Sequence, residues 1–163
     1  STQVIVVDAT TTETRRRFWE LLAETFSDIP LERLQEGFRR LPDETRFFAV
    51  ASEQGYLSAL FVAPIRVSGM RFGGIGGVCT RENHRGSGLG RLVLNRALAE
   101  TVDDYRALLL WTRIPRYFSN FGFVEVSQLF VPDPEGSTPM MHFNDGSSAA
   151  SILSLSDLPR EYF

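Results

Sequence analysis

Residues 78–91 read VCTRENHRGSGLGR. An apolar stretch ends here in a short polar turn, and three glycines then follow at alternate positions, 86, 88 and 90. We expect an amphipathic helix to begin directly at the last of them. Glycine backbone and a helix N-terminus would direct unpaired N–H groups to one place, where the helix dipole also favours negative charge. The stretch therefore predicts a binding site for phosphate groups.

The composition is that of one globular domain. The chain has 163 residues, of which 43% are hydrophobic and 23% charged, which is enough to bury a substantial core and too apolar for general disorder. No apolar run approaches the roughly 20 residues that a membrane span requires. A net charge of -3 argues against a nucleic-acid-binding surface. We therefore expect no membrane and no nucleic-acid partner.

The cysteine and lysine counts exclude several chemistries. Cys79 is the single cysteine, so there is no internal disulfide framework. Residues 1–3 begin no signal peptide, and both features predict a reducing, cytoplasmic location. All 17 basic residues are arginine. Lysine therefore cannot serve as a base, as a Schiff-base nucleophile or as a site of self-acylation.

The order of apolar patterns predicts an α/β (α+β) fold with a mixed, mostly antiparallel central sheet flanked by helices. We expect one domain over 1–145 and a partly irregular tail over 146–163. Four glycines at 73–77 are costly in a strand unless a bulge or a closely approaching ligand needs them. The predicted strands cover 3–7, 46–51, 56–62, 65–67, 70–72, 107–111, 123–131 and 140–143. The predicted helices are two before residue 46, separated by a break at 27–30, one after the glycine loop, and a short one over 114–120.

The two common nucleotide-binding loops do not fit these glycines. A P-loop requires Gly-x-x-x-x-Gly-Lys, and the chain has no lysine. A Rossmann loop requires Gly-x-Gly-x-x-Gly after the first strand. A start at Gly86 would place Arg91 where the third glycine belongs, and the loop lies in the middle of the chain. Another phosphate carrier is therefore expected.

A third pattern does match. The sequence has Arg-x-x-Gly-x-Gly at 85–90, preceded by Val-x-Thr at 78–80 on a strand. It resembles the pyrophosphate loop of the GNAT superfamily, the acyl-CoA-dependent N-acyltransferases. The segment YFSNFGF at 117–123 resembles the aromatic-x-x-x-Gly-Phe element of the same superfamily, at the expected spacing. The resemblance covers residues 46–131 well and the N-terminal helices more loosely. It implies acetyl-CoA as the acyl donor, with no metal.

The resemblance also implies which residues hold the donor. The strand segment Val78, Cys79 and Thr80 would bind pantetheine, with backbone pairing through Val78 and Thr80. Alternation turns the side chain of Cys79 towards the core. The side chain of Arg85 is a candidate either for phosphate contact or for an ion pair. The backbone amides expected to surround the pyrophosphate are those of Arg85, Gly86, Ser87, Gly88, Leu89, Gly90 and Arg91.

The acid and the base of the reaction are less well defined. In the superfamily the acid is commonly a tyrosine four residues before the glycine of Gly-Phe. That position holds Phe118, and the tyrosine comes one residue earlier, at Tyr117. One helical step turns a side chain by about 100°, so Tyr117 does not automatically take the place of the usual tyrosine. It is a candidate either for the acid or for a packing residue. Candidates for the base are Glu53, Glu82, His84, Glu125 and His142, and a water chain is an alternative to all of them.

Two functions fit the sequence. The first is an acetyl-CoA-dependent N-acetyltransferase that transfers acetyl directly to a primary amine of a small molecule or peptide. The second is a CoA-binding module with weak or no transferase activity that acts as a sensor or interaction domain. Phe118 and the absence of a carboxylate at 73–80 support it. By resemblance, acceptor specificity would come from the first two helices, the turn at 68–69 and the C-terminal strands. A homodimer through the late strands is a further expectation from the resemblance alone.

Overall fold

The computed structural model describes residues 3–7, 12–67, 69–127 and 136–146. They belong to two compact units, the first within 1–63 and 76–100 and the second within 64–75 and 101–163. Strands β3 (Gly55–Val67) and β4 (Met70–Thr80) each belong partly to one unit and partly to the other. Beyond Gly146, the tail expected from the sequence lies outside the described residues.

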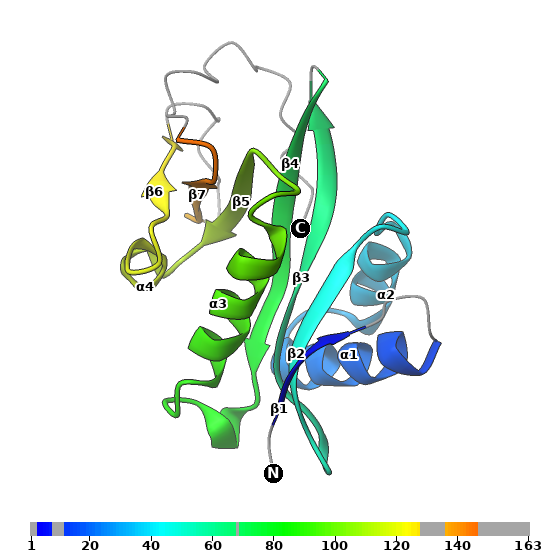
Figure 1. Ribbon diagram of the computed structural model, residues 1–163. Coiled ribbons are helices and arrows are strands. Elements are labelled where there is room, and N and C mark those ends of the chain that lie inside the picture. Colours follow the sequence, from blue (N-terminus) through cyan, green and yellow to red (C-terminus); the bar gives the residue numbers. More distant parts are fainter. Residues whose placement is uncertain (1–2, 8–11, 68, 128–135, 147–163) are drawn as a thin grey trace. The chain divides into compact units, whose positions relative to one another are not determined.

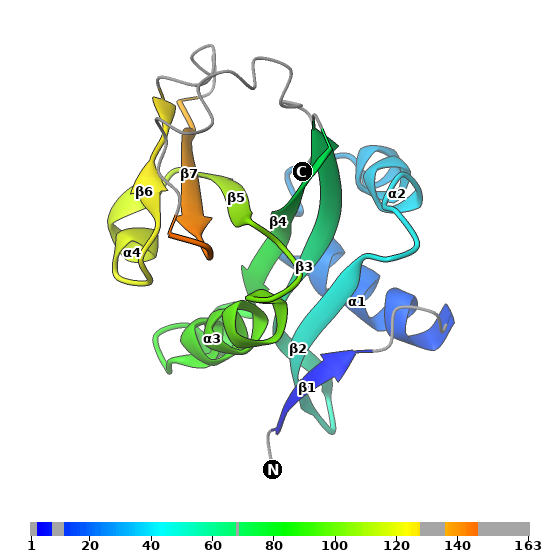
Figure 2. The ribbon, with the colours of Figure 1, turned by 45° about the horizontal axis from the view of Figure 1, so that its top comes forward.

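The strands of the first unit follow the order β1-β2-β3-β4. β1 (Gln3–Val7) is antiparallel to β2 (Arg46–Ser52), and β2 is antiparallel to β3. Helices α1 (Thr12–Thr25) and α2 (Leu31–Arg39) lie on one side of these strands, and α3 (Leu89–Thr101) lies on the other (Figure 1). Figure 2 shows the same arrangement from a second direction. The helices before residue 46 and the break between them are as predicted.

A cluster of four phenylalanines fills the space between α1, α2 and the strands: Phe18, Phe38, Phe47 and Phe61. The ring of Phe61 lies against the backbone of β4. An added Cβ at Gly76 would lie 2.8 Å from Cε1 of this ring, and one at Gly77 would lie 3.1 Å from Cδ2. Gly77 also has a φ of 61°, which residues with a side chain rarely adopt. A packed aromatic ring and a bend in the strand therefore account for these two glycines.

The second unit has the strand order β3-β4-β5-β7-β6. β5 (Ala107–Thr112) pairs in parallel with β4, with Phe72–Gly74 opposite Ala107–Leu109. β7 (Thr138–Phe143) is antiparallel to both β5 and β6 (Val124–Glu125), and the short helix α4 (Pro115–Ser119) connects β5 to β6. As the sequence predicts for a central strand, Leu108 and Leu109 are fully buried although they point to opposite faces.

Three predictions about the strands are wrong. The strands expected at 56–62 and 65–67 form one strand, β3, because the extended backbone that Pro64 requires is compatible with continuing it. The hairpin strand at 70–72 and the glycine-rich segment likewise form one strand, β4. The strand expected over 123–131 comprises Val124–Glu125, and Gln128–Val131 lies outside the described residues.

The expected fold class, a mixed and mostly antiparallel sheet flanked by helices, is confirmed. Within the part of the chain that the structure describes, no helix is both long enough and apolar enough to cross a membrane.

We predict that Gly76→Ala lowers the free energy of unfolding by about 1–3 kcal/mol, because the new methyl group would overlap the ring of Phe61. Gly37→Ala is the control, since nothing lies within 4 Å of its Cβ position in α2, and it should stabilise the chain by up to about 1 kcal/mol. Urea denaturation measures both. Equal stability of Gly76→Ala and the parent protein would contradict the packing described for Phe61.

Candidate active site

The end of β4 in the first unit presents its side chains alternately. Val78 is 39% exposed, Cys79 is 5% exposed, and Thr80 is half-buried. The hydroxyl of Ser58 on β3 donates to the carbonyl of Cys79 at 3.1 Å and lies 2.8 Å from the hydroxyl of Thr80. Since the proton of Ser58 is used towards Cys79, the Thr80 hydroxyl is the donor of the second bond. Ser58 therefore fixes the strand end, a role that the sequence did not reveal.

The burial of Cys79 confirms the prediction that its side chain belongs to the core. Burial raises the pKa of this thiol to about 12, and a weaker interaction with Thr25 acts in the opposite direction. The reactive form of cysteine is the thiolate. At neutral pH this residue is therefore protonated and is no nucleophile.

Arg81 fixes the point where the chain leaves β4. Its N–H donates to the carbonyl of Leu57 at 2.8 Å, its Nε donates to the carbonyl of Tyr56 at 2.7 Å, and its Nη1 pairs with the carboxylate of Glu24 at the end of α1. The side chain of Arg81 is 22% exposed. Arg81 thus bonds the start of the loop to strand β3 and to helix α1. Arg81 lies within the stretch 78–91, but nothing in the spacing of that stretch indicated that this residue anchors the loop.

A short 3₁₀-helix, η1 (Glu82–His84), follows. The amide of His84 donates to the carbonyl of Arg81 at 2.9 Å, and the hydroxyl of Ser87 donates to the carbonyl of His84 at 2.6 Å. The side chain of Arg85 is exposed, and its Nε donates to the carbonyl of Thr80 at 3.1 Å. The sequence predicted either a phosphate contact or an ion pair for this side chain. It forms no ion pair with a carboxylate of the described residues.

Glycine is required at two positions of the loop. Gly86 has a φ of 79° and Gly88 a φ of 85°, a left-handed conformation that costs other residues roughly 1–2 kcal/mol. Nothing lies within 4 Å of the Cβ position of either glycine. The open space is therefore where a ligand could approach the backbone without meeting a side chain.

The same stretch carries backbone donors without acceptors. The amide of Leu92 donates to the carbonyl of Gly88 at 3.1 Å and makes the first helical bond of α3, so the amides of Leu89 and Gly90 have no acceptor within the helix. Nor does any described carbonyl accept from the amides of Gly86, Ser87 or Gly88. These unpaired donors lie at the positive end of the α3 dipole. The arrangement can bind an anion such as a pyrophosphate.

The second unit contains the aromatic element. The amide of Gly122 donates to the carbonyl of Ser119 at 3.2 Å, and that of Phe123 donates to the carbonyl of Phe118 at 3.3 Å. With a φ of 89° at Gly122, these bonds form a Schellman cap at the end of α4. Such caps favour an apolar contact between the residues that Phe118 and Phe123 occupy, and their rings lie 5.8 Å apart.

The cap gives Phe118 a packing role at the position where the superfamily commonly has tyrosine. Its side chain is 4% exposed and is part of the core. The neighbouring Tyr117 is half-buried, with its ring 5.1 Å from that of Phe118 and 5.2 Å from that of Phe121. The two neighbours therefore have different surroundings: Tyr117, which has the hydroxyl, is partly exposed, and Phe118 is buried.

The candidates for a base are dispersed. Glu53 and Glu82 are exposed in the first unit, and Glu125 is exposed on β6. His84 is half-buried, and its Nδ1 has no hydrogen-bond partner among the described residues. His142 on β7 is half-buried, and its Nδ1 lies 2.9 Å from Oδ1 of Asn144. Among the described residues, no group of three or more His, Cys, Asp or Glu side chains is placed to hold a metal ion.

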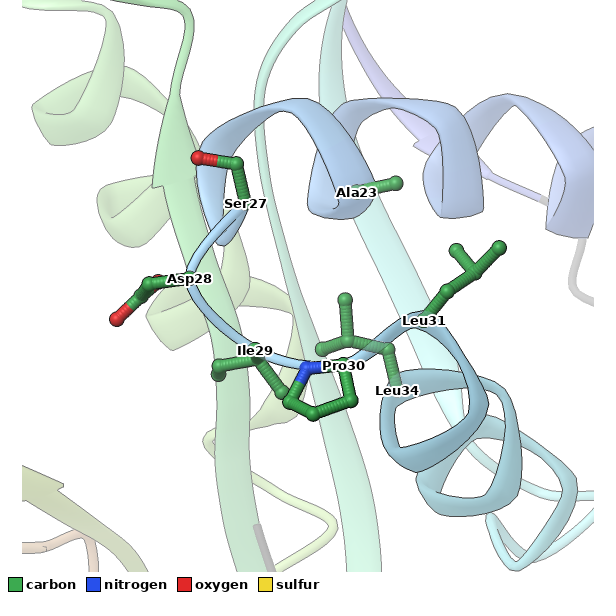
Figure 3. A pocket seen from close by; sticks show the side chains of 7 residues that line it. All are labelled: Ala23, Ser27, Asp28, Ile29, Pro30, Leu31 and Leu34. Carbon is green, nitrogen blue, oxygen red and sulfur yellow. The ribbon is translucent and has the colours of Figure 1, made fainter.

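A hollow of ≈ 360 Å³ lies at the turn between α1 and α2 (Figure 3). Its lining is mainly apolar, and Leu31 is a large hydrophobic residue that is 53% exposed. Asp28 points to the opposite side from Leu31 (Figure 3). The lining residues are Ala23, Ser27, Asp28, Ile29, Pro30, Leu31 and Leu34.

Residues 11–123 match the model of the acetyltransferase (GNAT) family. The chain belongs to this family. The matched range includes β4, the glycine loop, α3 and the aromatic element up to Phe123. The resemblance read from the sequence is therefore confirmed.

The solved structures agree with this family. An acyl-CoA N-acyltransferase from Pseudomonas aeruginosa is 22% identical, with a TM-score of 0.71 over 87% of this chain and 99% of that chain. A GNAT family N-acetyltransferase from Escherichia coli, solved in complex with CoA, is 18% identical, with a TM-score of 0.69 over 90% and 86%. At these identities the likeness establishes the GNAT fold.

A third solved structure, described as a probable N-acyltransferase from Enterococcus faecalis, is 19% identical with a TM-score of 0.65. It matches 77% of this chain, which spans 32% of that longer protein. None of the curated proteins matches this sequence.

Proposed function

We propose that the protein is an acetyl-CoA-dependent N-acetyltransferase that transfers the acetyl group directly to a primary amine of a small molecule or peptide. One observation carries this proposal. The loop has left-handed backbone at Gly86 and Gly88, open space at both, and unpaired amides leading into α3. This is the arrangement that a pyrophosphate requires, and the solved E. coli relative contains CoA.

The residues of the first unit fit this donor. The amides of Gly86 to Gly90 and the α3 dipole would hold the pyrophosphate. The amide of Arg85, which the sequence also led us to expect there, donates instead to the carbonyl of Glu82 at 3.3 Å. Arg85 keeps its terminal guanidinium nitrogens for a phosphate while its Nε is bonded to Thr80. The exposed strand end at Val78 to Thr80 would pair with pantetheine.

Direct transfer needs groups that handle protons as well as a donor site. The amine must lose a proton when it attacks, and the departing thiolate must gain one. Tyr117 is the residue we propose for the second task, because it is partly exposed whereas Phe118 is buried and has no hydroxyl. The chain has no lysine, so the acetyl group cannot pass through an acyl-lysine.

For the acceptor we propose an amine with an apolar portion. The apolar lining at the turn between α1 and α2 would accommodate that portion, and its volume of ≈ 360 Å³ suits a small molecule or a single side chain. The net charge of -3 favours a cationic acceptor.

A CoA-binding module with weak or no activity is the second candidate. The observation that favours it is Phe118, whose ring serves the α4 cap at the position where the superfamily commonly has its acid. Nothing in this alternative changes the donor site, so it predicts the same affinity for CoA.

We predict that Gly88→Ala weakens binding of acetyl-CoA about tenfold or more, as the left-handed backbone loses roughly 1–2 kcal/mol of support. Gly69→Ala is the matched control, because Gly69 has a φ of 78° and equally open space but lies in the turn between β3 and β4. Isothermal titration calorimetry measures both. Equal affinity in Gly88→Ala and Gly69→Ala would overturn the assignment of the loop.

Thiol release from acetyl-CoA separates the two candidate functions. With a panel of tyramine, spermidine and a short peptide with a free amino terminus, we predict turnover with at least one amine. Tyr117→Phe should then lower kcat about 10²-fold while the affinity for CoA stays the same, as expected for loss of a general acid. Full activity of Tyr117→Phe would remove Tyr117 from the mechanism. A large gain in turnover for Phe118→Tyr would show instead a degenerate site, and favour the binding module.

A further inference from the structure

A second hollow, of ≈ 200 Å³, lies in the first unit directly before the glycine loop. Three segments border it: the end of α1, the turn between β2 and β3, and residues 81–84 after β4. A water molecule occupies about 30 Å³, so the hollow accommodates a molecule of a few non-hydrogen atoms. Its lining is entirely polar and consists of Glu24, Gln54, Arg81, Glu82, Asn83 and His84.

The positive group of this lining is already bonded. Nη1 of Arg81 pairs with Oε2 of Glu24, and Nε donates to the carbonyl of Tyr56 at 2.7 Å. Nη2 lies against Gly55, where an added Cβ would be 3.5 Å from it. The pair of Arg81 with Glu24 is neutral as a whole. The lining therefore keeps no positive charge for an anionic ligand.

Hydrogen-bond acceptors, in contrast, are left over. The ion pair uses Oε2 of Glu24, and within the described residues no donor reaches Oε1 or the carboxylate of Glu82. The side-chain amides of Gln54 and Asn83 make no bond to the described part of the chain either. Nδ1 of His84 is buried and also lacks a partner there. Buried polar atoms without a partner are rare, and a bound water or ion is one explanation for them.

These groups match a small primary ammonium ion. Glu82 carries the formal charge of the lining that has no opposite charge beside it, so a single cation complements the hollow. An ammonium group has three N–H donors and no acceptor, and the free oxygens of Glu24, Glu82 and the two amides can accept from it. Quaternary ammonium ions are recognised by aromatic faces instead, which this lining lacks.

The hollow is also bonded to the glycine loop. The amide of His84 donates to the carbonyl of Arg81 at 2.9 Å, and the hydroxyl of Ser87 donates to the carbonyl of His84 at 2.6 Å. The 3₁₀-helix η1 thus forms one wall of the hollow and holds the first part of the loop. A ligand that bridges Glu24 of α1 and Glu82 of η1 would restrict η1. The loop would then lose less conformational freedom when it binds an anion.

We propose that this hollow binds the ammonium group of a small primary amine, and that an occupied hollow strengthens the binding of CoA at the loop. The ammonium group donates to the carboxylates of Glu24 and Glu82. The amine acts here as a ligand of the hollow, apart from any use as acetyl acceptor. Its binding depends on the hollow alone, whereas its effect on CoA rests on the proposed function.

Titration with ethylammonium chloride at constant ionic strength, followed by ¹H–¹⁵N correlation spectra, tests the site. Saturable shift changes should fall on the backbone amides of Gln54, Glu82, Asn83 and His84. Tetramethylammonium chloride is the matched probe, because it has the same charge and no N–H group, and it should leave these signals in place. Equal responses to the two salts, or no saturable response to ethylammonium, would overturn the site.

Glu82→Gln removes the unpaired charge of the lining and keeps the size of the side chain. It should weaken the binding of ethylammonium about fivefold, the upper range for an exposed ion pair. Glu53→Gln is the control, since Glu53 is exposed in the turn between β2 and β3 and does not line the hollow. It should keep the wild-type affinity. An equal loss in the two variants would show a general response to net charge and contradict the site.

Calorimetric titration with CoA measures the coupling. In saturating ethylammonium the wild type should bind CoA about fivefold more tightly, and Glu82→Gln should gain less at the same concentration. By reciprocity, CoA should tighten the binding of ethylammonium by the same factor. An unchanged affinity for CoA while the hollow is occupied would overturn the coupling. A protein that binds ethylammonium but no CoA would instead overturn the proposed function and leave the amine site intact.

Discussion

The ring of Phe61 lies against the backbone of β4 at Gly76 and Gly77, and the candidate site at the end of this strand depends on this contact. The ring belongs to a cluster that includes Phe18 of α1 and Phe47 of β2. The strand can approach it closely because neither glycine has a side chain. The same contact thereby positions the strand end that carries the loop.

The loop itself is held by its flanks and is left open at its centre. Arg81 ties the start of the loop to β3 and α1, and the Nε of Arg85 is bonded back to Thr80. Between Arg85 and α3, the amides of Gly86, Ser87 and Gly88 have no acceptor among the described carbonyls. The flanking side chains thus fix the loop, while the backbone donors inside it stay unpaired. This arrangement is suited to binding an anion. In the second unit, the Schellman cap at Gly122 plays a comparable part, because it holds Phe118 in the core and leaves Tyr117 and His142 partly exposed.

The sequence predicted the features that depend on local pattern. The helix after the glycine loop, the buried strand at 107–111 and the inward side chain of Cys79 all follow from spacing and alternation, and all are confirmed. Tertiary contacts determine what the sequence missed. The need for glycine at 76 comes from a ring fifteen positions away, at Phe61, and the role of Arg81 comes from Glu24 and Tyr56. The placement of β7 between β5 and β6 has no local signal either.

A titration of the ¹⁵N-labelled protein with CoA, followed by ¹H–¹⁵N correlation spectra, tests the central claim most directly. If the loop amides bind the pyrophosphate, the largest shift changes fall on Gly86, Gly88, Leu89 and Gly90, and inorganic pyrophosphate at high concentration moves the same signals. Binding of CoA that leaves these four amides unchanged, or no binding at all, would contradict the account.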